Sequence, residues 1–295
     1  MAKVVCIGEG MLELSRAGDG WQLCYGGDTL NTAIHLARTG HDVAYLTALG
    51  SDALSANLKE QWAAEGLDTS LVLDHPTRST GLYAIATDAA GERSFTYWRD
   101  SSAARDIFSL PGMAEALAEA RKADLLCFSL ISLAILPPEA RSGLLETARE
   151  VRAHGGGVAF DGNYRPRLWS SAAEASAARD AGIAVATIGL PTLEDEALLS
   201  GVADADAVAA HWQRCGSAEV VVKLGAKGCR LPDGSFLAPE EVFSPVDTSG
   251  AGDAFNAGYL GARINGADPV EAARAGHALA GWTIMRHGAI PAKDS

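Results

Sequence analysis

The sequence predicts an α/β fold in which helices cover a buried, mostly parallel sheet. Short apolar runs recur along the 295 residues, and Ala-rich amphipathic segments lie between them. Strands buried on both faces are almost continuously apolar, and parallel sheets are built from such strands. Polar and glycine residues follow the runs, at the edge where open parallel sheets bind ligands. The runs are VVCIG (4–8), VAYLTALG (43–50), ADLLCFSL (123–130), GVAFD (157–161), AVATIGL (184–190) and VVVKLG (220–225).

Length and composition favour one large domain over residues 1–295. With 48% hydrophobic and 21% charged residues, the chain has ordinary globular composition and is long enough for a substantial core. Its formal net charge of -13 argues against nucleic acid or an anionic membrane as the main partner, because both require a basic surface. An anionic small substrate needs only a few local arginines and stays compatible with this charge.

The cysteines and the apolar segments indicate a soluble protein of the reducing cytoplasm. Five cysteines are scattered without any C-x-x-C spacing, so neither a disulfide framework nor a zinc cluster is expected. No segment is apolar for long enough to span a bilayer. GEGMLE (8–13) lacks the third glycine of a dinucleotide-binding loop, and neither a P-loop nor the protein-kinase signatures occur.

Residues 80–99 break the α/β rhythm and predict an inserted β-hairpin. TGLYAIATDAAGERSFTYWR alternates apolar and polar residues around the turn-like DAAG (88–91). Phe95, Tyr97 and Arg99 are spaced by two, so they share one face of the second strand. That face either closes over a ligand or packs on the body and leaves Arg99 in solvent.

GGDTLNTAIHLARTG (26–40) predicts a helix with a ligand at its start. Asp28 or Thr29 is expected to cap it, and Gly40 to end it. Gly26, Gly27 and Asn31 lie where a polar ligand approaches backbone N–H groups. One face carries a buried apolar stripe of Leu30, Ala33, Ile34 and Ala37.

DGNYRPRLW (161–169) follows a predicted strand and carries two arginines. Arg165 and Arg167, beside Asp161 and Asn163, form either a solvated loop or, with Arg99, a site for a carboxylate. The fork of an arginine matches the two oxygens of a carboxylate.

DTSGAGDAF (247–255) predicts an anion site made without a basic side chain. Gly250 and Gly252 allow a tight turn between the strand-like VFSPVD (242–247) and an amphipathic helix from Ala254 onward. The N–H groups of 250–253 then lie at a helix N-terminus, which favours an anion. Asp253 either only favours the helix dipole or acts as general base for a hydroxyl that attacks phosphorus.

These motifs resemble the signatures of the PfkB, or ribokinase-like, carbohydrate kinases. The N-terminal signature corresponds to GGDTLNTAIHLARTG with LGSD, and the C-terminal one to DTSGAGDAFNAGYL. The similarity runs over almost the whole chain. It implies a Rossmann-like central sheet flanked by helices, with a small inserted β-lid formed by about 12–26 and 80–105, in one ribokinase-like kinase domain. The chain end HGAIPAKDS looks frayed.

Within that family, the chain is similar to the kinases of 2-keto-3-deoxygluconate. The similarity rests on GEGMLEL, GGDTLNTA, ALGSD, GERSFTYWRDSSAAR, DGNYRPRLW, VVVKLGAKG and RHGAIP. It implies phosphorylation of the 6-hydroxyl by ATP with Mg²⁺, in a homo-oligomer. Two alternatives are a fructokinase and a catalytically silent sugar-binding protein; the arginines favour a sugar acid over a neutral hexose, and an intact GAGD favours an enzyme.

The resemblance also implies roles for individual residues. Asp253 is the expected base, with Gly250, Ala251 and Gly252 as the anion hole. The sugar pocket is expected to contain Gly27, Asn31, Glu13, Tyr83, Tyr97, Arg99 and Arg165. The nucleotide is expected to meet Lys223, Gly225, Gly228 and His277. Asp195 and Glu194, in LPTLEDE, are the nearest counterparts of the family's N-x-x-E motif and are assigned to magnesium.

Overall fold

A seven-stranded parallel sheet forms the centre of the protein. The computed structural model describes residues 2–17, 20–87 and 93–293. The strand order is β11-β10-β9-β8-β1-β4-β5, and every neighbouring pair is parallel. The strands are β1 (Lys3–Ile7), β4 (Asp42–Gly50), β5 (Val72–His75), β8 (Leu125–Ser129), β9 (Gly157–Asp161), β10 (Ile188–Gly189) and β11 (Glu219–Val220). The predicted α/β fold is confirmed.

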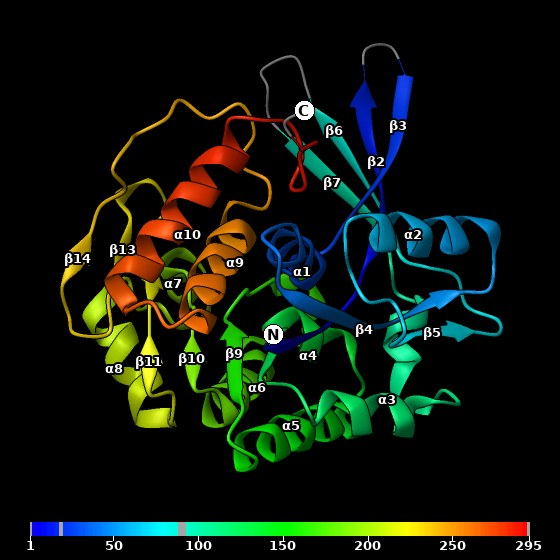
Figure 1. Ribbon diagram of the computed structural model, residues 1–295, viewed down its shortest axis with the longest axis horizontal. Coiled ribbons are helices and arrows are strands. Elements are labelled where there is room, and N and C mark those ends of the chain that lie inside the picture. Colours follow the sequence, from blue (N-terminus) through cyan, green and yellow to red (C-terminus); the bar gives the residue numbers. More distant parts are fainter. Residues whose placement is uncertain (1, 18–19, 88–92, 294–295) are drawn as a thin grey trace.

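Helices cover both faces of this sheet (Figure 1). One face packs against α1 (Asp28–Arg38), α2 (Ala53–Ala64), α9 (Ala251–Ile264) and α10 (Pro269–Ile284). The other packs against α3 (Met113–Ala120), α4 (Leu130–Ile135), α5 (Pro138–Ala153), α6 (Ala172–Val185), α7 (Leu193–Ser200) and α8 (Ala205–Cys215). Short 3-10 turns η1 (Ala103–Ser109), η2 (Pro166–Leu168) and η3 (Gly225–Lys227) complete the described helical elements.

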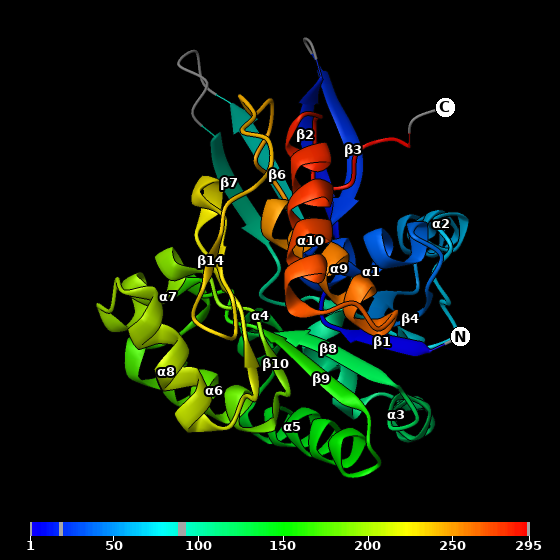
Figure 2. The ribbon, with the colours of Figure 1, turned by 60° about the vertical axis from the view of Figure 1, so that its left-hand side comes forward.

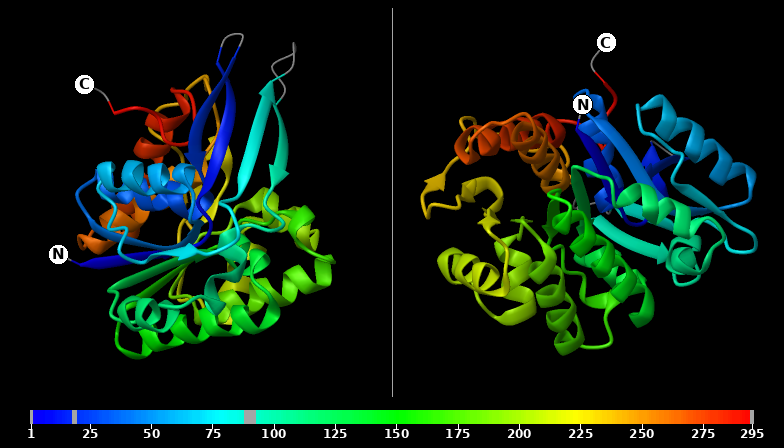
Figure 3. Two further views of the ribbon diagram at one scale, coloured as in Figure 1. Left: turned by 90° about the vertical axis from the view of Figure 1, so that its right-hand side faces the viewer. Right: turned by 60° about the horizontal axis from the view of Figure 1, so that its bottom comes forward.

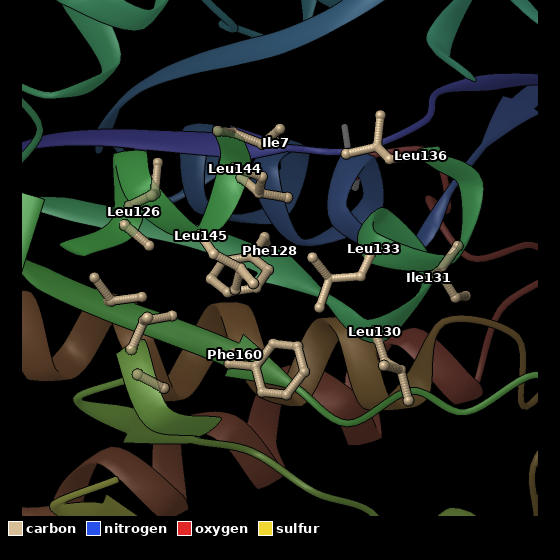
Figure 4. Close-up of a cluster of buried hydrophobic side chains, with 14 of the residues drawn as sticks. Ile7, Leu126, Phe128, Leu130, Ile131, Leu133, Leu136, Leu144, Leu145 and Phe160 are labelled. Carbon is tan, nitrogen blue, oxygen red and sulfur yellow. The ribbon is translucent and has the colours of Figure 1, made fainter. Parts of the chain in front are cut away.

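The two cores explain why the strands are apolar throughout. Val5 and Ile7 of β1 enter one cluster, whereas Val4 and Cys6 enter the other, because successive side chains of a strand point to opposite faces. Figure 4 shows part of the first cluster, in which the rings of Phe128 and Phe160 lie 5.0 Å apart.

A separate four-stranded sheet stands out from the body (Figure 3). Its order is β3-β2-β6-β7, formed by β2 (Met11–Ala17), β3 (Gly20–Gly26), β6 (Leu82–Thr87) and β7 (Arg93–Trp98). β6 and β7 pair antiparallel from Leu82↔Trp98 to Thr87↔Arg93, which confirms the two strands of the predicted hairpin. The predicted turn DAAG (88–91) lies outside the described residues.

A third, antiparallel sheet corrects the prediction for VVVKLG. β12 (Val222–Lys223) pairs with β13 (Cys229–Arg230), which pairs with β14 (Phe236–Leu237). The run 220–225 is therefore shared between the central sheet and this one. The strand predicted for AVATIGL (184–190) was also too long. α6 continues to Val185, so Ile183 and Val185 are buried in the core as helical residues, and the strand occupies only 188–189.

Two further predictions near the C-terminus are wrong. VFSPVD (242–247) is not a strand: Val242 is 80% exposed, and the N–H groups of Val246 and Asp247 donate to the carbonyl of Ile284 instead of to a neighbouring strand. The end of the chain is not frayed as far as Pro291, because the carbonyl of Pro291 bonds to Arg38 and the carbonyl of Ala289 bonds to His35, both on α1.

Among the described helices, none is both long and apolar enough to cross a membrane.

Candidate active site

The start of α9 forms a turn that only glycine can make. Gly250 is the N-cap residue with φ 69°, a left-handed conformation that disfavours side chains. A Cβ there would also lie 2.6 Å from the Cβ of Ala289. α9 begins at Ala251, so the amides of the first turn lie at a helix N-terminus, where anions are favoured. Figure 2 shows α9 lying between α1 and α10.

Asp253, in that first turn, is partly buried and holds a carboxyl group that protonates near neutral pH. Asn31 Nδ2 of α1 donates to its Oδ2 over 2.7 Å. Burial and the nearby carboxylate of Asp28 raise the pKa of Asp253 to about 7, against the opposing effects of Asn31 and Lys223. A general base works best with a pKa near the working pH, so Asp253 has the chemistry of a proton acceptor.

The ammonium group of Lys223 is held in place by hydrogen bonds to two neighbouring side chains. Lys223 Nζ donates to Asp161 Oδ2 and to Asn256 Oδ1, each over 3.0 Å, and Asn256 Nδ2 donates to the same Asp161 oxygen over 2.6 Å. Its Nζ lies 3.7 Å from where a Cβ of Gly252 would stand. Lys223 therefore places a positive charge beside the start of α9.

Asn256 was missed by the sequence reasoning. It lies four residues after Gly252 on α9, a spacing that puts both on one helix face, and this spacing could have pointed to it.

A cavity of about 20 Å³, room for about one water molecule, lies among Asp28, Asp161, Asp253 and Asn256. Burial raises the pKa of Asp28, whose Oδ2 accepts a bond from Asn163 Nδ2 over 3.2 Å.

One face of the four-stranded sheet brings together four residues predicted for the sugar. Glu13 pairs with Tyr83 and Tyr83 with Tyr97 across the strands, and Tyr83 Oη donates to Glu13 Oε2. The rings of Tyr83 and Tyr97 lie 5.8 Å apart, and the guanidinium of Arg99 lies 5.8 Å from the centre of the Tyr97 ring. Arg99 is only 6% exposed, so the alternative that left it in solvent is wrong.

Gly27 is the N-cap of α1, which corrects the predicted cap at Asp28 or Thr29. No side chain caps this helix. Gly27 has φ 149°, and a Cβ there would lie 2.2 Å from the carbonyl oxygen of Glu9, so the position has no room for a capping side chain.

Arg165 and Asp195 meet at the loop after β9. The Arg165 side chain is 50% exposed, and its Nη1 donates to the carbonyl of Tyr164 over 2.7 Å and to Asp195 Oδ1 over 3.2 Å. Burial raises the pKa of Asp195, and the charge of Arg165 opposes this effect. Glu194 and Arg167 are exposed.

The residues predicted for the nucleotide lie at the end of β12 (Lys223), around η3 (Gly225 and Gly228) and on α10 (His277). Gly225 begins η3 with φ 59°, and Gly228 ends it, where a Cβ would lie 2.0 Å from the carbonyl oxygen of Leu237. The His277 ring lies 5.3 Å from that of Phe255, and burial lowers its pKa. Both ring nitrogens of His277 are buried and lack a hydrogen-bond partner in the described residues.

The family model of the pfkB family carbohydrate kinases matches residues 1–295. The chain belongs to this family. The 2-dehydro-3-deoxygluconokinase of Dickeya dadantii (strain 3937) is 41% identical to this pfkB-family chain over 97% of its length and 96% of the relative's. The enzyme of the same name from Escherichia coli (strain K12) is 40% identical over 99% and 98%.

Solved structures agree with the pfkB fold. A putative ribokinase II from E. coli, solved in complex with ATP and Mg²⁺, has a TM-score of 0.84. The match covers 98% of this pfkB-family chain and 95% of the other chain. At 21% identity, it shows only that the two proteins share a fold.

The pKa of Asp253 in this pfkB-family protein gives a testable pH dependence. We expect kcat/KM for the sugar to rise as pH increases through about 7, because the base must lose its proton to act. Asp28→Asn removes the carboxylate whose charge raises this pKa most and is expected to move the inflection to lower pH. Steady-state kinetics between about pH 5 and 9 measures both. A pH profile without an inflection in this range, or one whose inflection Asp28→Asn leaves unmoved, would contradict the role of Asp253.

Proposed function

We propose that the protein transfers the γ-phosphoryl group of ATP to the 6-hydroxyl of 2-keto-3-deoxygluconate, which is also named 2-dehydro-3-deoxygluconate. The observation that carries the proposal is the partly buried Asp253, with its pKa of about 7, in the first turn of α9 beside Lys223. The relatives of that name, at 40% and 41% identity, support this substrate.

Asp253 would accept the proton of the attacking hydroxyl. The hydroxyl oxygen forms its bond to the γ-phosphorus while the bond from phosphorus to the leaving oxygen of ADP breaks. Asn31 would hold the carboxylate of Asp253 in place through its 2.7 Å bond. The amides of Gly250, Ala251 and Gly252, with Lys223, would stabilise the charge that develops on the phosphoryl oxygens.

The residues present fit a magnesium–nucleotide complex. Buried ring nitrogens of His277 without partners suit a purine base, and the start of α9 suits phosphate. We propose Lys223, Gly225, Gly228 and His277 for the nucleotide. Asp195, whose carboxylate lies next to Arg165, and the exposed Glu194 are proposed to hold Mg²⁺. Bound Mg²⁺ neutralises part of the phosphate charge.

Arginines and tyrosines would select a sugar acid. Arg99 and Arg165 are proposed to bind the carboxylate end, and a neutral hexose offers them no partner. Asn31 Oδ1 is buried and has no partner among the described residues, so it suits a sugar hydroxyl. The remaining pocket residues that we propose are Gly27, Glu13, Tyr83 and Tyr97.

We further propose that the segments 12–26 and 80–105 form a lid on a single kinase domain and that the protein is a cytoplasmic homo-oligomer. All five cysteines are free thiols, which suits a reducing compartment. Trp21, Leu23 and Trp98 are exposed on the face of the four-stranded sheet opposite Tyr83, and exposed apolar side chains on one face suit a contact between copies.

ADP release measured with 2-keto-3-deoxygluconate, fructose and ribose, each offered separately with Mg-ATP, tests the proposal. Turnover that depends on the sugar acid is expected. A better turnover of fructose or ribose would overturn the substrate, and no turnover with any sugar would favour a silent binding protein.

A further inference from the structure

A buried ion pair lies where the four-stranded sheet joins the body. Glu9 lies two residues after the end of β1 and is 2% exposed, and Arg99 directly follows β7. Arg99 Nη2 donates to Glu9 Oε2. Neither residue of the pair is required by the fold of the strands themselves, since both lie just beyond strand ends.

Glu9 contacts each of the other points at which the chain passes between the body and this sheet. Its carbonyl oxygen is 2.2 Å from where a Cβ of Gly27 would lie, between β3 and α1. Its Oε1 is 2.7 Å from where a Cβ of Gly81 would lie, just before β6. Its other carboxylate oxygen bonds Arg99, just after β7. Glu9 therefore lies at the base of the whole sheet.

The pair is incompletely satisfied. In the part of the chain that the structure describes, Glu9 Oε1 and Arg99 Nε are buried and have no hydrogen-bond partner. Buried polar groups without partners are costly, so a free donor and a free acceptor at this pair suit a polar ligand. Burial raises the pKa of the half-buried Asp28, and the charge of Arg99 opposes this effect.

We propose that Glu9 is a positioning residue that fixes one edge of the Arg99 guanidinium, so that its remaining N–H groups face the acid group of the substrate. This inference rests on the proposed sugar-acid kinase function. Without the charge of Glu9, that edge of the Arg99 guanidinium loses its partner and the side chain is no longer held toward the substrate. Sugar-acid binding weakens, and the phosphoryl-transfer machinery around Asp253 and Lys223 stays intact.

Steady-state kinetics of Glu9→Gln tests this role. We expect KM for 2-keto-3-deoxygluconate to rise about 10-fold, with kcat and KM for ATP changed by less than about 3-fold. In an Arg99→Met background the same substitution is expected to change KM by less than about 2-fold, because there is no guanidinium left to position. Additive effects in the two backgrounds, or a lower KM in Glu9→Gln alone, would overturn the proposal.

A control and a second variant separate positioning from general loss of stability. Glu219→Gln breaks another Glu–Arg pair, in which Arg263 Nη2 lies 2.7 Å from Glu219 Oε2 between β11 and α9, and should leave KM for the sugar acid unchanged. If Glu9→Gln does not fold, Glu9→Asp provides the second variant, because it keeps the negative charge but holds it farther from Arg99. It should raise KM for the sugar acid when Arg99 is present and leave KM unchanged in Arg99→Met. Absent turnover of the sugar acid by the unmodified protein would instead refute the proposed function.

Discussion

Asp253→Asn is expected to lower kcat by roughly 100-fold or more and to leave sugar binding nearly unchanged. Asparagine has the shape of aspartate and can still accept the bond from Asn31 Nδ2, now 2.7 Å, but it cannot take a proton. Its position in the first turn of α9 tolerates the amide. Steady-state kinetics, with calorimetric titration of the sugar, measures the two effects separately.

A carboxylate at the start of another helix provides the control for this experiment. Asp204 caps α8, where its Oδ1 accepts from the amide of Ala207 over 2.8 Å. If Asp253 served only the helix dipole, Asp204→Asn and Asp253→Asn would both change stability slightly and leave kcat alone. Near-normal kcat in Asp253→Asn would remove this residue from the reaction.

Local sequence patterns predicted the elements that have a regular period of apolar residues. The helix at 28–38 and the hairpin strands 82–87 and 93–98 follow from their local period and turn signals, but the burial of each element does not: α1 is buried on all sides from Thr29 to Leu36, whereas residues 94–98 of β7 are exposed. VFSPVD was misjudged for a tertiary reason: β-propensity needs a neighbouring strand, and Val246 and Asp247 bond instead to Ile284 at the end of α10.

The candidate site shows the same division. The sequence predicted Asp253 and Asn31, which lie in recognisable helix starts, and the structure brings them into contact across 222 residues. It did not predict Asn256 or the pairing of Glu9 with Arg99, because their partners lie 33 to 95 residues away in the chain and no local pattern encodes such a contact. The N-cap of α1 was missed because the carbonyl of Glu9 leaves room only for glycine at 27.

Arg165→Ala is expected to remove most of the preference for a sugar acid. The unmodified protein should have a kcat/KM for 2-keto-3-deoxygluconate at least about 100-fold above that for fructose, since a hydrogen bond to a charged group contributes about 1.5 to 3 kcal/mol and two arginines act together. The Arg165 side chain is half exposed, and an exposed ion pair such as its contact with Asp195 contributes little to stability, so its guanidinium can turn to a ligand at small cost. Kinetics with both sugars measures the ratio.

Arg167 provides a matched control for the Arg165→Ala experiment. It lies two residues further along in η2, is also an arginine and is exposed, so Arg167→Ala removes the same charge from the same loop. If the loop attracts the acid only through its general positive charge, both variants will lose preference equally, and the effect will fade with salt. If Arg165 binds the carboxylate directly, only Arg165→Ala loses it, with fructose turnover unchanged in both. Equal losses would therefore refute a specific contact while leaving the phosphoryl transfer at Asp253 untouched.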